Sequence, residues 1–214
     1  MERRPIIRDV IERTAGRPQL ADIGAAILAG GAATRLPGKL ALDVEGLPLV
    51  ARVRRNVAGV GETLLSVATT PEAEIDALLD APLVVDRGRR RGPLGGLVTT
   101  LALMHKRLVF VVAGDVPRAG TALIQTLARA YSPGDEAVVP EHPDDKGTRL
   151  EPLCALYDRA ALLDVVSAVL REPDASMHGV LARLRTRRVW FSNAAVFVNV
   201  NTPADYARLQ NASN

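Results

Sequence analysis

The sequence feature that most constrains the fold is an apolar segment that ends in two glycines and continues into a loop of small residues. Residues 25–29 are all apolar, Gly30 and Gly31 follow them, and the loop then carries Arg35 and Lys39. Small residues let a backbone approach a polyanion closely, and its N–H groups can form an anion-binding nest. We therefore expect a strand followed by a phosphate-binding loop, with a structural glycine turn as the alternative.

Two common glycine-loop patterns do not describe this segment. The Walker loop requires a glycine, four residues, and then Gly-Lys-Ser/Thr. Here Gly38-Lys39 is followed by Leu40, and the position five residues before Gly38 is Ala33. The dinucleotide-binding pattern G-x-G-x-x-G does not fit either. The loop is thus predicted to bind a triphosphate through another arrangement, with Lys39 supplying positive charge.

Apolar segments with strand character alternate with helical segments along the rest of the chain, which predicts an α/β fold. We expect an α/β sheet whose strands are mostly parallel. The expected strands are 23–29, 64–68, 82–85, 108–112, 137–139, 153–157, 188–191 and 195–198, with weak alternation at 40–44. The expected helices are 48–57, one capped by Thr70, 92 to about 106, one opened by Pro117, 159–170, 177–184 and 203–210.

Ligands of such sheets bind beyond the carboxyl ends of the strands. The glycine loop follows the first expected strand, Asp86 and residues 92–96 follow the third, and Asp115 follows the fourth. One crevice could therefore be lined by all of them. A carboxylate directly after a buried strand can hold Mg²⁺ between phosphate oxygens, although Asp115 could instead cap the helix expected at Pro117.

The remaining chemistry-bearing residues are less informative. Residues 87–91 hold four arginines, which either bind a phosphorylated ligand or form a solvated loop. His105, His142 and His178 have no metal-ligand spacing, so we expect them at the surface or in loops. Cys154 lies in an apolar strand and is expected to be buried.

Two asparagines stand close to the C-terminal end of the sequence. Asn199 and Asn201 flank Val200, and the helix expected at Pro203 follows. Asn201 or Thr202 can cap this helix, with proline in its first turn. The other asparagine is then available to bind a ligand.

Composition excludes several classes of protein. The chain has 214 residues, 48% of them hydrophobic, so it can bury a sizeable core. Its 3% aromatic content argues against a stacking platform for nucleic acid, and the net charge of +3 suits a phosphorylated ligand. The sequence shows no apolar run long enough for a membrane helix, no secretory signal and one cysteine, so we expect a cytoplasmic protein.

Five blocks of the sequence, in this order, resemble the MobA-like molybdenum cofactor guanylyltransferases of the nucleotidyltransferase superfamily. They are residues 28–39, 92–96, 114–117, 151–157 and 199–203. The resemblance covers about residues 24–210. It implies a single Rossmann-like three-layer α/β domain with a mostly parallel sheet, similar to the nucleotide-diphospho-sugar transferases. We place this domain at residues 22–214, after an N-terminal extension at residues 1–21.

The resemblance also implies roles for individual residues. Arg35 and Lys39 would contact the triphosphate and Asp115 would bind Mg²⁺, which makes these three the catalytic residues. The nucleotide-binding residues would be Leu28, Ala29, Gly30, Gly31, Lys39, Thr69, Asp86, Gly92, Pro93 and Leu94. Asn199 and Asn201 would face the acceptor.

Members of this family transfer GMP from GTP to the phosphate of molybdopterin and release pyrophosphate, and contact with other proteins of molybdenum cofactor biosynthesis is implied. The pair Gly30-Gly31 favours guanine, because cytidylyl-transferring relatives tend to have Ala-Gly there. The sequence departs from the family pattern at two positions, and both concern the choice of base. The segment between Arg35 and Lys39 is shorter than usual and contains Pro37, and Thr69 stands where an Asn is common. Transfer with CTP, transfer to a sugar phosphate or phospholactate, and a non-catalytic nucleotide-binding adaptor are the alternatives.

Overall fold

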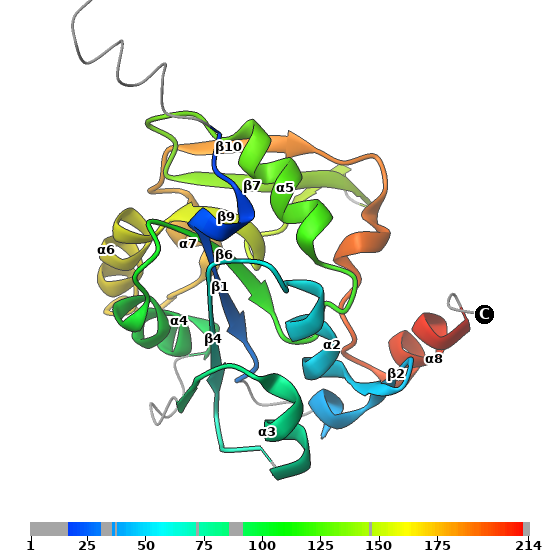
Figure 1. The fold of residues 1–214 in the computed structure, drawn as a ribbon. Coiled ribbons are helices and arrows are strands. Elements are labelled where there is room, and N and C mark those ends of the chain that lie inside the picture. The colour runs from blue at the N-terminus through cyan, green and yellow to red at the C-terminus, as the bar shows by residue number, and fades with distance from the viewer. Residues whose placement is uncertain are drawn as a thin grey trace, which may run out of the picture.

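The computed structural model describes residues 17–30, 36, 38–71, 73–85, 92–145 and 147–211. Within these ranges, an eight-stranded sheet forms the centre of the molecule and helices cover both of its faces (Figure 1). Seven strands follow the order β10-β7-β9-β6-β1-β4-β5, and β8 pairs with β7. The strands are β1 (Ile23–Leu28), β4 (Glu62–Val67), β5 (Leu83–Val85), β6 (Leu108–Ala113), β7 (Ala137–Asp144), β8 (Gly147–Leu150), β9 (Cys154–Asp158) and β10 (Thr186–Trp190).

The middle of the sheet is parallel, and two strands, β8 and β9, run in the opposite direction. β1 pairs in parallel with both β4 and β6, and all six of its residues are buried. Strands buried on both faces are typical of parallel sheets, which explains the near-continuous apolar sequence of β1 and β6. β9 runs antiparallel to β6, with Val112 opposite Cys154. The start of β9 therefore lies at the same sheet edge as the end of β6.

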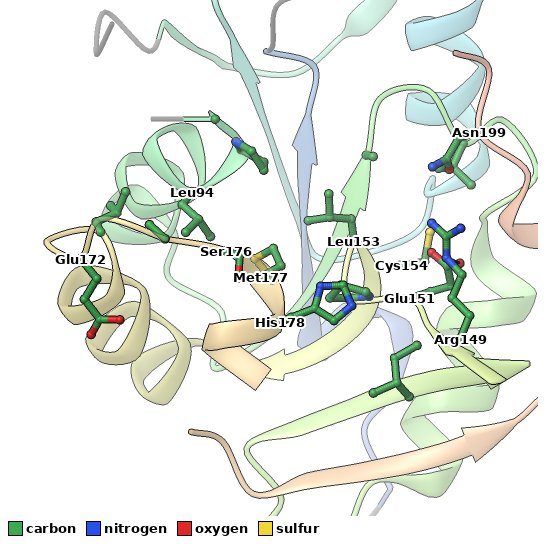
Figure 2. A pocket seen from close by; sticks show the side chains of 18 of the residues that line it. Leu94, Arg149, Glu151, Leu153, Cys154, Glu172, Ser176, Met177, His178 and Asn199 are labelled. Carbon is green, nitrogen blue, oxygen red and sulfur yellow. Dashed lines mark ion pairs between the residues drawn. The ribbon is translucent and has the colours of Figure 1, made fainter. Parts of the chain in front are cut away.

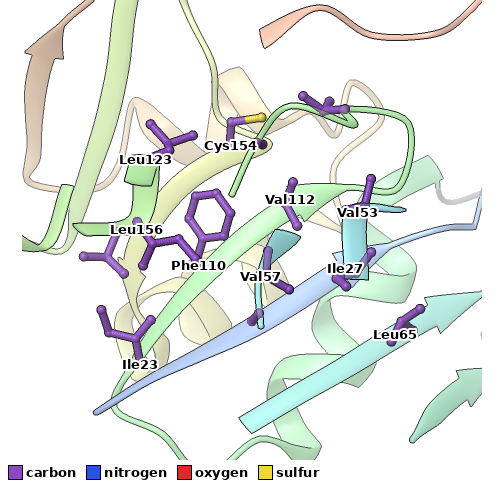
Figure 3. Packing of buried hydrophobic residues seen from close by; sticks show 14 of the residues in the cluster. Ile23, Ile27, Val53, Val57, Leu65, Phe110, Val112, Leu123, Cys154 and Leu156 are labelled. Atoms are coloured by element: carbon purple, nitrogen blue, oxygen red, sulfur yellow. The ribbon is translucent and has the colours of Figure 1, made fainter. Parts of the chain in front are cut away.

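The sheet divides the hydrophobic core into two layers, and helices cover each of them. α2 (Leu49–Asn56) and α5 (Thr121–Ala130) cover one face, while α4 (Gly92–Leu103), α6 (Arg159–Val169) and α7 (Met177–Leu181) cover the other. Side chains alternate along β1, so that Ile23 and Ile27 pack in the first layer and Leu28 packs in the second. Figure 3 shows the first layer, where Phe110 of β6 lies among aliphatic side chains. The expected three-layer α/β fold is thus confirmed.

Smaller elements complete the described chain. A two-stranded sheet of β2 (Asp43–Val44) and β3 (Leu47–Pro48) packs with α8 (Pro203–Asn211), and α3 (Ala73–Leu79) lies beside α2. The 3-10 helices are η1 (Leu20–Asp22), η2 (Lys39–Ala41) and η3 (Ala194–Phe197). Leu20 of η1 packs against the first layer of the core. Residues 1–16 lie outside the described ranges, so the expected boundary between extension and domain stays a prediction.

Several expected elements are wrong in position or type. Pro117 does not open a helix: its carbonyl accepts a hydrogen bond from Asn56 Nδ2 at 2.5 Å, and α5 begins only at Thr121. The polar residues 141–151 are mostly a β7–β8 hairpin rather than a loop. The apolar residues 195–198 belong to η3 rather than to a strand. Residue 72, next to the described start of α3, lies outside the described residues, so the expected capping by Thr70 stays a prediction. No helix in the described part of the chain could span a membrane.

Candidate active site

Three of the predicted site residues meet at the carboxyl edge of the sheet. Lys39 begins η2, Asp115 follows β6, and Asn201 precedes α8. The Lys39 ammonium donates hydrogen bonds to Asp115 Oδ2 at 2.5 Å and to Asn201 Oδ1 at 2.9 Å. Residues that are far apart in the sequence therefore form one charged cluster.

Local backbone geometry places Asp115 in this cluster. The Gly114 N–H donates to the Leu28 carbonyl at 2.9 Å, which brings the end of β6 against the end of β1. A Cβ at position 114 would lie 3.1 Å from the Ala29 Cα, so glycine suits this close approach. The Val200 N–H donates to the Asp115 carbonyl at 2.9 Å. The asparagine segment is thereby held directly over the carboxylate.

The cluster is largely shielded from water. The side chain of Lys39 is 16% exposed and that of Asp115 is 14% exposed, and low exposure strengthens their attraction. Among the described residues, the buried Asp115 Oδ1 has no hydrogen-bond partner. Asp115 Oδ2 and Asn201 Oδ1 thus both contact the Lys39 ammonium, and Asp115 Oδ1 has no partner within the described part of the chain. Such oxygens are the ligands that Mg²⁺ prefers.

A cavity of about 710 Å³ opens beside the cluster. Leu94 at the start of α4 lies at one end, and Arg149 and Asn199 lie at the other (Figure 2). Leu153 and Cys154, at the start of the reversed strand β9, also line it. The cavity therefore extends from β9, beside β6, to the first turn of α4, a helix that packs on β1, β4 and β5.

Cys154 combines burial with neighbouring negative charge. Burial raises the pKa of its thiol well above the usual range, and the carboxylates of Glu151 and Asp115 raise it further. The expectation that Cys154 is buried is confirmed. The thiol is consequently protonated and poorly nucleophilic at neutral pH.

The other predicted residues lie around the same edge. Leu28 and Ala29 are buried, and a Cβ at Gly30 would lie 3.3 Å from the Ala68 backbone nitrogen at the end of β4. Thr69 is exposed directly after that strand. The segment Gly92-Pro93-Leu94 forms the first turn of α4 and lines the cavity. Gly31, Arg35, Asp86 and residues 87–91 lie outside the described residues.

The structure shows which residue of the asparagine segment caps α8 and leaves the two asparagine side chains for other contacts. The Thr202 hydroxyl accepts a hydrogen bond from the Asp205 N–H at 3.2 Å, so Thr202 caps α8 as one of the two expected alternatives. Asp205 Oδ2 accepts a hydrogen bond from the Thr202 hydroxyl at 2.8 Å. This hydrogen bond lowers the pKa of Asp205, and bonds from the backbone N–H groups of Asn201 and Thr202 add to the effect. Together they outweigh burial, which alone would raise the pKa. Asn199 and Asn201 therefore keep their side chains on the cavity and on Lys39, respectively.

Sequence reasoning missed one wall of the cavity. His142 was expected at the surface, but it is buried beside Glu151, and Arg149 and His178 line the cavity. A usable signal was the spacing of Arg149 and Glu151, because residues two apart in extended chain share a side. Their pairing with His142 depends on the β7–β8 hairpin, which was read as a loop.

The fold and this cluster together define a class of protein. A mostly parallel α/β sheet carries a lysine–aspartate pair at its carboxyl edge, next to a glycine-rich turn and a ligand-sized cavity, as expected for a nucleotidyltransferase. Residues 25–189 match the model of the MobA-like NTP transferase domain. The chain belongs to this family of nucleotidyltransferases.

Comparisons with individual proteins agree with this assignment. The chain is 30% identical to the molybdenum cofactor guanylyltransferase of Desulfosudis oleivorans over 196 residues, which cover 87% of this chain and 93% of the relative. Its fold resembles that of the molybdopterin-guanine dinucleotide biosynthesis protein A from Archaeoglobus fulgidus, with a TM-score of 0.69, 23% identity and coverage of 89% and 98%. The 2-C-methyl-D-erythritol 4-phosphate cytidylyltransferase of Thermus thermophilus gives 0.71 at 15% identity, with coverage of 89% and 98%.

Proposed function

We propose that this nucleotidyltransferase transfers GMP from GTP to the phosphate of molybdopterin, with Mg²⁺ and with release of pyrophosphate. The observation that carries the proposal is the shielded cluster of Lys39, Asp115 and Asn201 at the carboxyl edge of the sheet. The name of the Desulfosudis oleivorans relative supports the choice of guanylyl transfer and of this cofactor pathway.

The two substrates approach the cluster from opposite sides of β6. The glycine turn after β1 and the segment after β4 lie on one side, and we assign the nucleotide to them. The end of the cavity next to β9, with Arg149 and Asn199, lies on the other side, and we assign the acceptor to it; the opposite end, at the first turn of α4, holds residues expected to bind the nucleotide. This arrangement places the reacting phosphates close to Lys39 and Asp115, which lie between the two regions.

The chemistry that the chain must perform is a phosphoryl-group substitution. An oxygen of the acceptor phosphate attacks the α-phosphorus of GTP, a new P–O bond forms, and the bond to pyrophosphate breaks with its electron pair. The reaction needs no covalent enzyme intermediate. Lys39 stabilises the negative charge on the phosphate oxygens, and its low exposure makes this stabilisation stronger than it would be in water. The cluster also orients the two phosphates, which lowers the entropic part of the barrier.

The residues present fit a divalent cation. Asp115 would hold it, since Oδ1 is buried and has no partner among the described residues, and Asn201 offers a further oxygen. A bound Mg²⁺ would neutralise charge on the phosphate oxygens of the nucleotide. In the structure, Lys39 supplies the positive charge that balances Asp115.

Pyrophosphate release tests the proposal. We expect Mg²⁺-dependent release with GTP and molybdopterin together, and little release with ATP, CTP or UTP or without the acceptor. Release with CTP instead would keep the site but overturn guanine as the base. Tight GTP binding without release would overturn molybdopterin as the acceptor, and no nucleotide binding at all would make the glycine turn structural.

A further inference from the structure

An ionic network in the wall of the cavity has no role in the chemistry described so far. Its members are His142 on β7, Arg149 on β8, and Glu151, which directly follows β8. His142 and Arg149 are opposite each other in the β7–β8 hairpin. Arg149 and Glu151 both line the cavity. The network therefore connects a buried histidine to the surface that an acceptor would touch.

The histidine holds Glu151 in a fixed position. His142 Nε2 lies 2.9 Å from Glu151 Oε1, and Nδ1 lies 2.8 Å from the Pro143 carbonyl oxygen. The carbonyl can only accept, so Nδ1 is the donor of that hydrogen bond. The ring also stacks on Phe197, with centroids 5.1 Å apart and planes 9° from parallel. The His142 ring is thus fixed on three sides.

Glu151 in turn orients Arg149. Arg149 Nε lies 3.0 Å from Glu151 Oε1, the same oxygen that contacts His142. Among the described residues, neither terminal nitrogen of the guanidinium has a partner, and the side chain is 55% exposed. Figure 2 shows this guanidinium at the end of the cavity where Asn199 lies. An arginine with only its inner nitrogen engaged presents its two outer nitrogens to a ligand.

We propose that Arg149 binds the phosphate of the acceptor, and that Glu151 and His142 are positioning residues that aim it. The proposal rests on the proposed function, in which the acceptor reacts through a phosphate. Among the described residues that line the cavity, Arg149 is the only lysine or arginine. A phosphate monoester carries a charge of about −1.5 to −2 near neutral pH, and a guanidinium binds such a group through two parallel hydrogen bonds.

Kinetics with a matched control tests the assignment. Arg149→Ala is expected to raise the KM for molybdopterin about tenfold to a hundredfold and to leave the KM for GTP unchanged, because charge-assisted hydrogen bonds to one substrate are lost. Arg149→Lys should recover only part of this loss, since it keeps the charge but not the fork. The control is Arg188→Ala, which also removes an exposed arginine paired with a glutamate, Glu141, but lies outside the cavity.

The positioning role has its own measurement. His142→Gln keeps a side chain that can hydrogen-bond Glu151 but loses the stacked ring, and His142→Phe keeps a ring but cannot hydrogen-bond Glu151. If His142 acts through Arg149, both variants should raise the KM for molybdopterin several-fold, and neither should change the KM for GTP. Equal changes in the two KM values, or a change in kcat alone, would overturn the positioning role.

A binding measurement separates this proposal from the proposed function. Inorganic phosphate is titrated with GTP-loaded protein, and broadening of its ³¹P signal is compared between unmodified protein, Arg149→Ala and Arg188→Ala. Loss of broadening only in Arg149→Ala supports the phosphate site, even if molybdopterin supports no turnover and the proposed function fails. Equal broadening in all three proteins, or an unchanged KM for molybdopterin in Arg149→Ala, would overturn it.

Discussion

Asp115 follows the buried strand β6, and its carboxylate accepts a hydrogen bond from the Lys39 ammonium. Asp115→Asn keeps the shape of the side chain but removes its charge. We expect turnover to fall about a hundredfold to a thousandfold, in the range measured for the loss of one group that stabilises transition-state charge. Circular dichroism should be unchanged.

Asp164→Asn provides the matched control for this prediction. Asp164 is an exposed aspartate on α6, so its replacement should leave pyrophosphate release intact. Turnover of Asp115→Asn within a few-fold of the unmodified enzyme would show that the carboxylate charge has no part in the reaction.

Cys154 allows a second test at the scale of one residue. Its thiol lines the cavity, yet burial and the charges of Glu151 and Asp115 raise its pKa. We expect alkylation by iodoacetamide at pH 8 to be much slower in the folded protein than in urea, because the thiolate is the reacting form. Mass spectrometry over time measures both rates. Comparable rates would mean that the thiol is neither buried nor held in its neutral form.

The sequence allowed the prediction of some site residues and not of others. Asp115 and Lys39 could be found because a strand end and a glycine turn identify the sheet edge from local sequence alone. His142 could not, since its burial depends on a ring contact with Phe197, which is far from it in the chain, and on a contact with Glu151 that forms only when β7 and β8 pair. For Gly31, Arg35 and Asp86 the assigned roles stay predictions.

At the scale of an element, Glu62 fastens the start of β4 to the segment after α4. Its carboxylate accepts hydrogen bonds from the backbone N–H groups of His105 at 2.9 Å and Lys106 at 3.1 Å. Burial alone would raise the Glu62 pKa, but hydrogen bonds from His105 and Lys106 outweigh it, so the pKa lies below its ordinary value of 4.5. The charged carboxylate therefore stabilises the folded state.

The sign of the pH dependence follows from that lowered pKa. The contribution is complete above the unfolded-state pKa and is lost as the pH falls through the folded-state pKa. We expect Glu62→Gln to lower the free energy of unfolding by about 1 kcal/mol at neutral pH and to reduce the loss of stability below about pH 4.5. Urea titrations at several pH values measure this, with the exposed Glu74→Gln as control. An identical pH profile for both variants would contradict the prediction.

The elements that sequence reasoning placed wrongly share a physical cause. The β7–β8 hairpin is polar and contains Pro140 and Pro143, so its local sequence resembles a loop. The strand structure of residues 141–150 comes from the pairing of β7 with β8, and β10 pairs with β7 only as far as Glu141. Residues 195–198 are short and apolar like a strand, but Phe197 packs against His142 and Phe191 within a 3-10 turn.

At the scale of the whole molecule, the separation of the two substrate regions predicts independent responses to ligands. GTP with Mg²⁺ at about 100 times its Kd should stabilise the fold by about 2.7 kcal/mol, or roughly 5–10 °C in Tm. Lys39→Ala should lose most of this shift, and EDTA should reduce it. Arg149→Ala should keep it fully.

Differential scanning fluorimetry measures these shifts, with ATP as the nucleotide control. A full shift in Lys39→Ala would remove Lys39 from triphosphate binding. A reduced GTP shift in Arg149→Ala would show that the two regions are not independent, because Arg149 would then also contact the nucleotide.

The reversed direction of β9 has an evolutionary consequence. Because β9 starts at the sheet edge where β6 ends, the hairpin and turn over residues 137–153 reach the cavity directly and form one of its walls. This stretch includes no part of β1, β4 or β5. With the acceptor in the proposed position, mutations in that single continuous stretch would change which acceptor fits and would leave the glycine turn after β1 unaltered. Enzymes of this architecture can thus diverge in acceptor by exchanging one hairpin, and grafting residues 137–153 between relatives is the corresponding route for engineering.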